Sequence, residues 1–446
     1  MNASPPGPAG EPLFGSSRKY ADDPFRFLSA CERAYGDVAH FELGSMDTYL
    51  IMDPSAIERV LVSEAEHFRK PDFQSDALGD LLGEGLLLSE GETWERQRKL
   101  ANPAFAMGRL AEFDDRIVDY AESMLSEWSE GDVVDVEIEM TRVTLDVIVD
   151  LMLGTELSEE RIQTIQECLE PLGAQFEPDP LSFATPEWVP MPGDREYQQA
   201  LETLEGVVSE IVAERRGTEG SGDGPMDLLS VLLRAQSRGE QTERQLRDEV
   251  VTILLAGHDT TALTLTYTWY LLSQHPEARE RLQAEVAQKV DGDRPTMDDV
   301  RDFEYVEWVI DEAMRLYPPV YTIFREATTD VELSGYAVPE GTALMLPQWA
   351  VHRSPRFWDD PESFDPERWR PERTGDRSRF AYFPFGGGPR HCIGKHLAKL
   401  EAQLILATTA DRYELDYARD RPLSFRPSLT MHPEGGMPMR VRERGP

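Results

Sequence analysis

Cys392, one of three cysteines in the chain, lies in the glycine-rich stretch FPFGGGPRHCIG at residues 383–394. A helix that begins at or just after this cysteine is predicted by the apolar stripe of Ile393, Leu397, Leu400 and Leu404. The free N–H groups and the dipole of a helix N-terminus favour a thiolate over a thiol. The glycines permit positive φ or a close backbone approach to a flat partner. A thiolate in such a cradle, with Arg390 beside it, suits a heme iron and its propionates.

Two other interpretations of this stretch are a glycine-flanked structural cysteine and a cysteine hydrolase. A nucleophilic cysteine needs a general base close to its sulfur. His391 and His396 are the nominal candidates for that base. Heme that stays bound through purification would exclude the hydrolase.

A second chemical stretch is AGHDTT, residues 256–261, inside a long apolar segment. Asp259 next to Thr260 places a carboxylate beside a hydroxyl, a pair that can carry protons into an apolar pocket. A mid-helix threonine that bonds back to its own helix can also bend it and open a groove. Residues 250–272 are long enough for a membrane span, but a charge at its centre costs about 3 kcal/mol. A core helix is therefore expected, and no transmembrane anchor.

Both stretches resemble motifs of one family. FGGGPRHCIG is similar to the heme-binding signature F-x-x-G-x-R-x-C-x-G of the cytochrome P450 heme-thiolate monooxygenases. The agreement covers its five specified positions, Phe385, Gly388, Arg390, Cys392 and Gly394. AGHDTT resembles the family's oxygen-activation stretch. The motifs follow in the family's order, and the resemblance implies a P450 fold over the whole chain.

Two further motifs concern charge pairing. EAMR at 312–315 resembles the family's E-x-x-R, and residues three apart share a helix face, so Glu312 and Arg315 can pair. DPERWRPER at 365–373 resembles the P-E-R-F element, with Trp369 in place of the usual Phe. The resemblance implies that Arg368 completes a buried triad with Glu312 and Arg315.

The resemblance also implies the heme contacts. Cys392 is the metal ligand of heme b (iron protoporphyrin IX). GETWERQRKL at 91–100 resembles the family's W-x-x-x-R, whose two side chains stand one helical turn apart and can both reach a propionate. The expected cofactor-binding residues are Cys392, Trp94, Arg98, Arg325, Arg390, Phe385, Gly386, Gly394 and Ala256.

The implied function is insertion of one oxygen atom from O2 into a hydrophobic small molecule, with Asp259 and Thr260 delivering protons. Three cysteines leave none to spare for an iron–sulfur centre, so a separate ferredoxin or flavodoxin is the expected electron donor. Half of the six lysines, Lys99, Lys395 and Lys399, lie in segments expected on the thiolate side. They are predicted to form a basic docking spot, although scattered surface charge is the alternative. A gas sensor, an isomerase or a peroxygenase would share the cysteine cradle, but the Asp–Thr pair favours O2 with external electrons.

A mostly apolar pocket suits a hydrophobic substrate such as a fatty acid or an isoprenoid or carotenoid-like compound. The irregular segment 176–194 mixes prolines with aromatic residues and is a candidate lid. The predicted pocket residues are Phe73, Leu82, Leu86, Phe176, Ile253, Ala256, Val320, Ile323 and Leu429. Arg69, Lys70 and Arg325 are the basic residues that lie near these segments.

The chain of 446 residues carries 83 acidic against 45 basic residues, a formal net charge of −38. This surface would repel nucleic acid and anionic membranes. A surface rich in acid and poor in lysine suits high salt, where screening suppresses self-repulsion. With no signal-like apolar N-terminus and few cysteines, the predicted location is a reducing, high-salt cytoplasm; an ordinary acidic cytosolic protein is the alternative.

The fold that must position these residues is predicted to be mainly α with a minor β part. A single heme domain over 1–446 is expected, because no linker divides the composition. Residues 38–54 have a hairpin pattern within a β-containing part at about 1–75, and strands are expected near 329–346 and 412–442. The glycine-rich stretch 215–227 is a predicted loop. Helices are predicted over 109–128, 136–153, 195–215, 227–238, 242–274, 276–289, 304–317 and 393–410.

Overall fold

The computed structural model describes residues 4–110, 113–181, 191–218 and 227–444. Its helices are α1 (Ser17–Asp22), α2 (Pro24–Tyr35), α3 (Pro54–Glu58), α4 (Asp72–Leu82), α5 (Gly91–Ala101), α6 (Met107–Leu110), α7 (Asp114–Leu125), α8 (Val136–Ile148), α9 (Glu159–Ala174), α10 (Asp194–Thr218), α11 (Leu228–Ser237), α12 (Glu243–Gln274), α13 (Pro276–Lys289), α14 (Met297–Asp302), α15 (Tyr305–Leu316), α16 (Gln348–Val351), α17 (Pro371–Thr374) and α18 (Lys395–Arg412). Its strands are β1 (Val38–Leu43), β2 (Met46–Ile51), β3 (Phe68–Arg69), β4 (Val133–Asp135), β5 (Ile323–Ala327), β6 (Val331–Leu333), β7 (Tyr336–Val338), β8 (Ala343–Leu346), β9 (Tyr413–Tyr417), β10 (Phe425–Pro427), β11 (Met431–Pro433) and β12 (Pro438–Glu443). The mainly α composition with a minor β part is as predicted.

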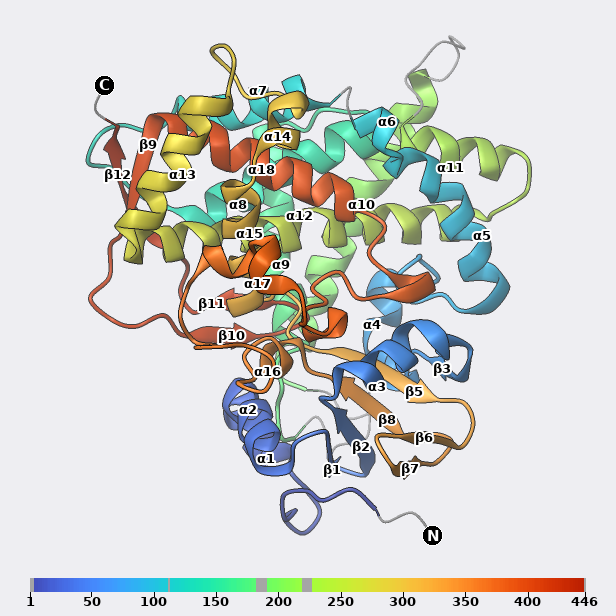
Figure 1. Cartoon of the computed structure of the whole chain (residues 1–446). Coiled ribbons are helices and arrows are strands. Elements are labelled where there is room, and N and C mark those ends of the chain that lie inside the picture. The colour runs from blue at the N-terminus through green and yellow to red at the C-terminus, as the bar shows by residue number, and fades with distance from the viewer. Residues whose placement is uncertain (1–3, 111–112, 182–190, 219–226, 445–446) are drawn as a thin grey trace.

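Figure 1 shows the main sheet with α1 and α2 at one end of the molecule and the helical bulk at the other. The five strands lie in the order β1-β2-β8-β5-β3. β1 and β2 form the predicted hairpin, with Val38 opposite Ile51 and Leu43 opposite Met46. β8 then joins β2 in parallel, and β5 pairs with β8 antiparallel. The sheet thereby unites an early hairpin with strands from beyond residue 320.

α12 crosses the helical part and packs against α8 and α18 (Figure 1). It begins with a capping box between Thr242 and Gln245 and ends where Pro276 starts the next helix. A Cβ at Gly257 would come within 2.6 Å of the Ile148 side chain of α8, so a larger residue here would require Ile148 to shift. No helix of the described ranges has the combined length and apolarity to cross a bilayer.

Three sequence expectations need correction. The helix predicted over 109–128 is α7, which begins only at Asp114 after the short α6, and two acidic residues in its first turn favour that start. α18 begins at Lys395, because the amide of Cys392 bonds the carbonyl of Phe385 instead of entering the helix. β5 and the helices α2, α4 and α9 were not in the predicted set. The last turn of α9 contains Pro171, which weakens its helical pattern.

The predicted charge triad is buried between α15 and the turn after residue 365. Glu312, Arg315 and Arg368 have side chains 0–2% exposed. Arg315 binds both carboxylate oxygens of Glu312 at 2.8 and 2.9 Å, and Arg368 Nε donates to Glu312 Oε1 at 2.8 Å. The remaining guanidinium N–H groups donate to backbone carbonyls, among them those of His352 and Ser363. This network ties α15 to the segment that precedes the cysteine loop.

Candidate functional site

A cavity of about 2090 Å³ lies between the cysteine loop, α12 and the segments around α4, β5 and β11. The predicted catalytic, cofactor-binding and pocket residues all line this cavity. The residues of the Glu312 triad do not line it and are structural. Of the predicted lid, residues 182–190 lie outside the described part of the chain. The described flanks contribute Phe176 and Met191 to the cavity wall.

The cysteine loop is held by its backbone. Gly386 and Gly388 have φ of +65° and +63°, values that disfavour a side chain. A Cβ at Gly388 would come within 1.8 Å of the Leu61 carbonyl oxygen, and one at Gly387 within 2.7 Å of Phe380. The Cys392 N–H closes the loop on the carbonyl of Phe385 at 2.9 Å. The thiol is therefore fixed in position and open to the cavity.

Burial raises the pKa of the Cys392 thiol, while the amides of Gly394 and Lys395 and the charge of Arg98 act in the opposite direction. The expectation that the helix N-terminus by itself favours the thiolate is thus only partly met, because α18 starts three residues later. Amides directed at the sulfur suit a thiolate bound to a metal ion. Of the two nominal bases for a hydrolase, His391 is occupied, since its Nδ1 contacts the Gly388 carbonyl and its Nε2 contacts Arg98.

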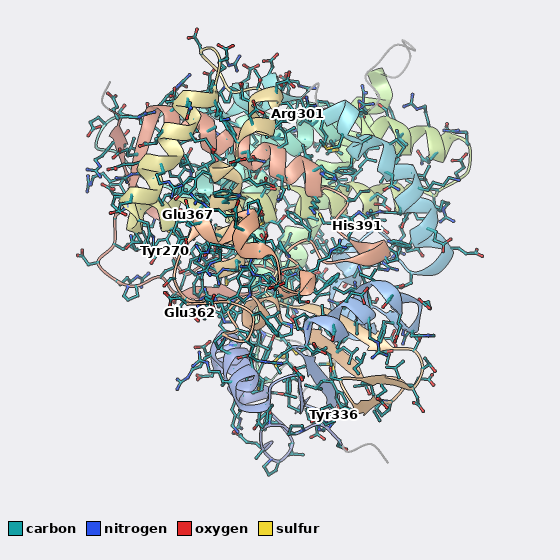
Figure 2. The ribbon with its side chains drawn as sticks, in the orientation of Figure 1. Tyr270, Arg301, Tyr336, Glu362, Glu367 and His391 are labelled. Carbon is teal, nitrogen blue, oxygen red and sulfur yellow. The ribbon has the colours of Figure 1, made fainter. Side chains whose placement is uncertain are left out.

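Four basic side chains surround one end of the cavity. We call Lys70, Arg98, Arg325 and Arg390 the cationic cluster. Arg390 binds the Ser89 carbonyl and the Glu90 carboxylate and lies 4.5 Å above the Trp94 ring. Arg98 donates to the carbonyl of His391, whose position beside α5 is labelled in Figure 2.

The cationic cluster carries more positive charge than the protein neutralises. Burial and the neighbouring guanidinium groups hold the pKa of Lys70 well below its ordinary value. Burial, followed by the charge of Arg390, lowers the pKa of Arg325 to about 10. Arg390 Nη1 is buried without a partner within the described residues. These groups fit an anionic ligand with two carboxylates, and the open thiol fits an iron, so the residues fit heme.

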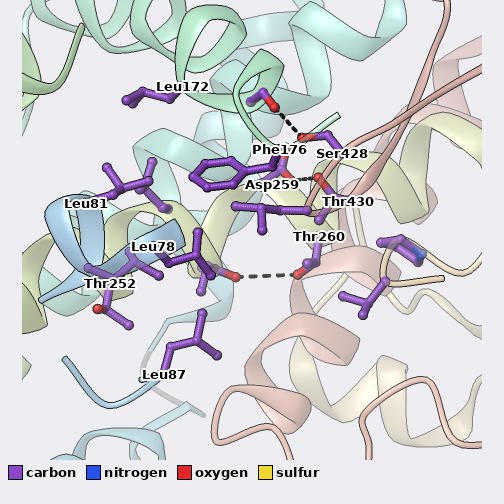
Figure 3. A pocket seen from close by; sticks show the side chains of 18 of the residues that line it. Leu78, Leu81, Leu87, Leu172, Phe176, Thr252, Asp259, Thr260, Ser428 and Thr430 are labelled. Atoms are coloured by element: carbon purple, nitrogen blue, oxygen red, sulfur yellow. Dashed lines mark hydrogen bonds between the residues drawn. The ribbon is translucent and has the colours of Figure 1, made fainter. Parts of the chain in front are cut away.

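The Asp–Thr pair lies on the α12 wall of the same cavity (Figure 3). Thr260 Oγ1 is 3.5 Å from the Ala256 carbonyl, at the outer limit of a hydrogen bond. Asp259 Oδ2 accepts a hydrogen bond of 2.7 Å from Thr430, and His432 lies 3.7 Å from Asp259 Oδ1. Asp259 is therefore restrained by the C-terminal strands, while the Thr260 hydroxyl is only weakly engaged.

The remaining wall is largely apolar. Phe73 and Phe324 pack edge to face with ring centroids 5.2 Å apart. Leu429 at the rim is 43% exposed. Figure 3 shows Leu78, Leu81, Leu87 and Phe176 facing the cavity from α4, the loop that follows it and the segment after α9. The structure places all nine predicted pocket residues here, namely Phe73, Leu82, Leu86, Phe176, Ile253, Ala256, Val320, Ile323 and Leu429.

Sequence reasoning missed three functional contacts. Lys70 was considered only as a substrate clamp, and it lies with Arg325 and Arg390. Thr430 and His432 carried no motif signal, because their partner Asp259 is about 170 residues away in the chain. The Trp369 substitution was expected to be merely tolerated, yet its indole N–H donates to Glu312 Oε2 at 3.0 Å.

The three lysines of the predicted docking spot differ in their surroundings. Lys99 is exposed, and the Lys395 ammonium lies 5.7 Å from the centroid of the Phe385 ring. Lys399 is only 21% exposed and binds Glu307 at 2.8 Å and Asp311 at 3.2 Å. Its charge is neutralised locally, so Lys399 does not belong to a free basic surface.

Comparison with known proteins places this geometry in a family. The family model of cytochrome P450 matches residues 5–439. A cyclooctat-9-en-7-ol 5-monooxygenase from Streptomyces melanosporofaciens is 34% identical over 412 residues, covering 92% of this chain and 88% of the relative. A pentalenene oxygenase from Streptomyces avermitilis is 30% identical over 432 residues, covering 96% and 94%.

The fold agrees with the sequence match. The crystal structure of the cytochrome P450DA heme domain superposes with a TM-score of 0.88 at 28% identity, covering 100% of this chain and 99% of that one. A free thiol in a glycine cradle, a cationic cluster in which Arg390 Nη1 has no partner within the described residues, and an Asp–Thr pair converge on one cavity. This chain belongs to the cytochrome P450 family, as a monooxygenase.

Proposed function

We propose that this P450 hydroxylates a cyclic terpenoid, with heme b as its cofactor and a separate protein as its electron donor. The observation that carries the proposal is the apolar cavity wall on which Cys392 and the Asp–Thr pair converge. Two relatives support the terpenoid class, because their names specify cyclooctat-9-en-7-ol and pentalenene. The wall contains leucine, isoleucine and phenylalanine side chains, which suit a rigid hydrocarbon.

Bound heme with a thiolate ligand supplies O2 activation and oxygen insertion. Cys392 holds the iron, and the cationic cluster together with Trp94 holds the propionates. Phe73, Ile253, Val320 and the other apolar residues orient the substrate and exclude water. Asp259 takes up a proton, and Thr260 passes protons from it into the cavity.

The test is a spectral titration of the purified heme-loaded protein. Reduced protein with carbon monoxide should show the far red-shifted Soret band of sulfur-ligated heme, and Cys392→Ser should abolish it. Pentalenene and cyclooctat-9-en-7-ol should shift the ferric spectrum at lower concentration than lauric acid. A tighter response to lauric acid would overturn the terpenoid assignment and leave the heme assignment intact.

The relay assignment has its own test. Thr260→Ala should lower the product formed per O2 consumed and leave the heme spectrum unchanged. Product yield equal to that of the wild type would remove Thr260 from the mechanism.

We place the docking surface for the electron donor at Lys99 on α5 and Lys395 on α18, with the exposed His396 next to Lys395. An acidic ferredoxin or flavodoxin suits such a spot on a chain of net charge −38. Lys99→Glu and Lys395→Glu should slow salt-sensitive reduction. Lys289→Glu, at an exposed lysine on α13, is the matched control. Equal rates in all three variants would refute this surface.

We also infer adaptation to high salt from the 83 acidic residues and the scarcity of lysine. The Debye length falls to about 3 Å at 1 M salt, which suppresses repulsion between surface carboxylates. The thermal midpoint should therefore rise from dilute buffer to molar potassium chloride. A midpoint independent of salt would place the protein among ordinary acidic proteins.

A further inference from the structure

A chain of hydrogen bonds runs from Asp259 along the cavity wall to the first turn of α8. Thr430 Oγ1 donates to Asp259 Oδ2 at 2.7 Å, a contact drawn in Figure 3. The same Oγ1 lies 3.0 Å from His432 Nε2. His432 Nδ1 lies 2.8 Å from Glu137 Oε1. The chain thus joins α12, the turn before β11 and the first residues of α8.

The direction of these bonds follows from the number of protons. The Thr430 hydroxyl has one proton and gives it to the Asp259 carboxylate, so His432 must donate Nε2–H to Thr430. The contact between Nδ1 and Glu137 then needs a second proton, carried by either partner. The His432–Glu137 pair therefore holds one proton more than a neutral imidazole and a carboxylate would hold.

We propose that His432 and Glu137 form a proton store that recharges Asp259 through Thr430. In one transfer the His432 Nε2–H bond breaks and a new Thr430 O–H bond forms. The original Thr430 proton moves to Asp259 Oδ2, and the step involves no oxidation or reduction. A rotation of the His432 ring that returns its N–H to Thr430, followed by uptake of one proton from bulk solvent at Glu137, restores the starting state. This inference rests on the proposed role of Asp259 as a proton donor.

Access to water supports this direction. The side chains of His432, Glu137 and Asp259 are 20%, 17% and 19% exposed, so none is sealed in the core. Ile138, next to Glu137 on α8, is 54% exposed. All four side chains of the chain line the cavity, and its Glu137 end lies next to this exposed position, where water can reach it.

The surrounding carboxylates favour the protonated form of His432. Burial lowers the pKa of His432, but Asp259 and Glu137 outweigh burial and the net pKa is raised. The pKa of Glu137 is also raised, in this case because of burial. Arg426 on β10 opposes the charge of His432, but it is itself paired with Glu170 and Glu177 at 3.3 and 3.6 Å. The other titratable groups that face this chain are Asp135, at the N-cap of α8, His258 and Tyr267 on α12, and Glu177 itself.

The decisive measurement is the protonation of His432, which does not depend on turnover. Nitrogen-15 NMR of labelled histidines in the reduced, carbon-monoxide-bound protein, assigned with His432→Gln, reports both ring nitrogens. The midpoint should lie above the ordinary histidine value of about 6.5. Glu137→Gln should lower this midpoint, because it removes a carboxylate from the ring. A midpoint at or below the ordinary value in the wild type would overturn the proposal.

The second measurement is product formation during turnover. Its substrate is pentalenene, or whichever of the titrated compounds gives the largest spectral shift. Thr430→Val and His432→Gln should lower product per O2 roughly tenfold, with the largest loss at high pH and no change in the spectral binding constant. Thr430→Ser should restore the yield, because it keeps the hydroxyl. His40→Gln, in a surface histidine–carboxylate pair with Asp47, is the control substitution.

The two hypotheses fail in different ways. If Thr260→Ala lowers product yield while Thr430→Val does not, the proton store is refuted and the Asp–Thr relay stands. If none of these substitutions lowers product yield, the relay itself is wrong. A loss of yield in Thr430→Val that Thr430→Ser does not rescue indicates packing damage and also counts against the proton path.

Discussion

The Glu312 triad is buried and the cationic cluster is half-buried, and both bring basic side chains together. Only in the triad does the protein supply hydrogen-bond partners to the guanidinium groups throughout. Glu312 and backbone carbonyls accept hydrogen bonds from both guanidinium groups of the triad. The cationic cluster has the single carboxylate of Glu90 for four basic residues, and Arg390 Nη1 has no partner within the described residues. The supply of partners by the protein distinguishes residues that stabilise the fold from residues that are suited to bind an anionic ligand.

The largest effect is expected from breaking the triad. Glu312→Gln leaves Arg315 and Arg368 buried without a counter-charge, which should cost about 3–5 kcal/mol of the free energy of unfolding. Chemical denaturation of heme-free and heme-loaded protein measures it, and both forms should lose stability. Glu307→Gln, which breaks the half-exposed pair with Lys399, should cost only about 0–1 kcal/mol. Similar losses of stability in the two variants would show that the buried triad contributes no more to stability than a half-exposed ion pair.

A smaller effect of opposite sign is expected in the cationic cluster. Arg325→Gln removes a charge that burial and Arg390 disfavour and that makes no direct ion pair within the described residues, so the heme-free chain should become more stable. The heme-loaded protein should instead lose heme about tenfold faster, since a hydrogen bond to a charged group contributes about 1.5–3 kcal/mol. Transfer of heme to excess apomyoglobin measures the rate.

The control for that variant is Arg238→Gln, at an arginine whose side chain is 61% exposed. Neither the stability of the heme-free chain nor the rate of heme loss should change. If Arg325→Gln destabilised the heme-free chain, the cationic cluster would be structural like the triad.

The smallest effect concerns the indole that joins the triad. Trp369→Phe removes the N–H donor to Glu312 Oε2, which still accepts from Arg315 Nε at 2.9 Å, so the loss should be about 1 kcal/mol. A double-mutant cycle with Glu312→Gln isolates this bond from the change in side-chain volume. A coupling energy of zero would show that the tryptophan contributes only packing.

Local sequence signals predicted a large part of the fold. α13 has the bounds that were predicted, and α15 differs by one residue at each end, because Pro276 and the residues before Pro318 limit these helices. The hairpin of β1 and β2 follows from alternation around a short turn. Spacing within a helix also placed Glu312 and Arg315 on one face.

Contacts between distant segments were beyond such signals. Lys70 reaches Arg325 and Arg390 only because β3 and β5 lie side by side in the sheet. His432 meets Glu137 across 295 residues of chain, and no motif marks either position. α18 starts later than its apolar stripe suggests, because the amide of Cys392 bonds Phe385. Strand pairing in the first case and hydrogen bonds in the other two decided what periodicity left open.

The close approach of Gly388 to the Leu61 carbonyl has a consequence for minimal versions of this enzyme. The loop that presents the thiol rests on backbone supplied more than 320 residues earlier, with no room for even a methyl group between them. Consider a shortened protein that lacks the first 70 residues but keeps the cysteine, the long central helix and the C-terminal strands. It would lose the backbone on which the loop of its sulfur ligand packs. The ligand loop cannot be transplanted as a module by itself.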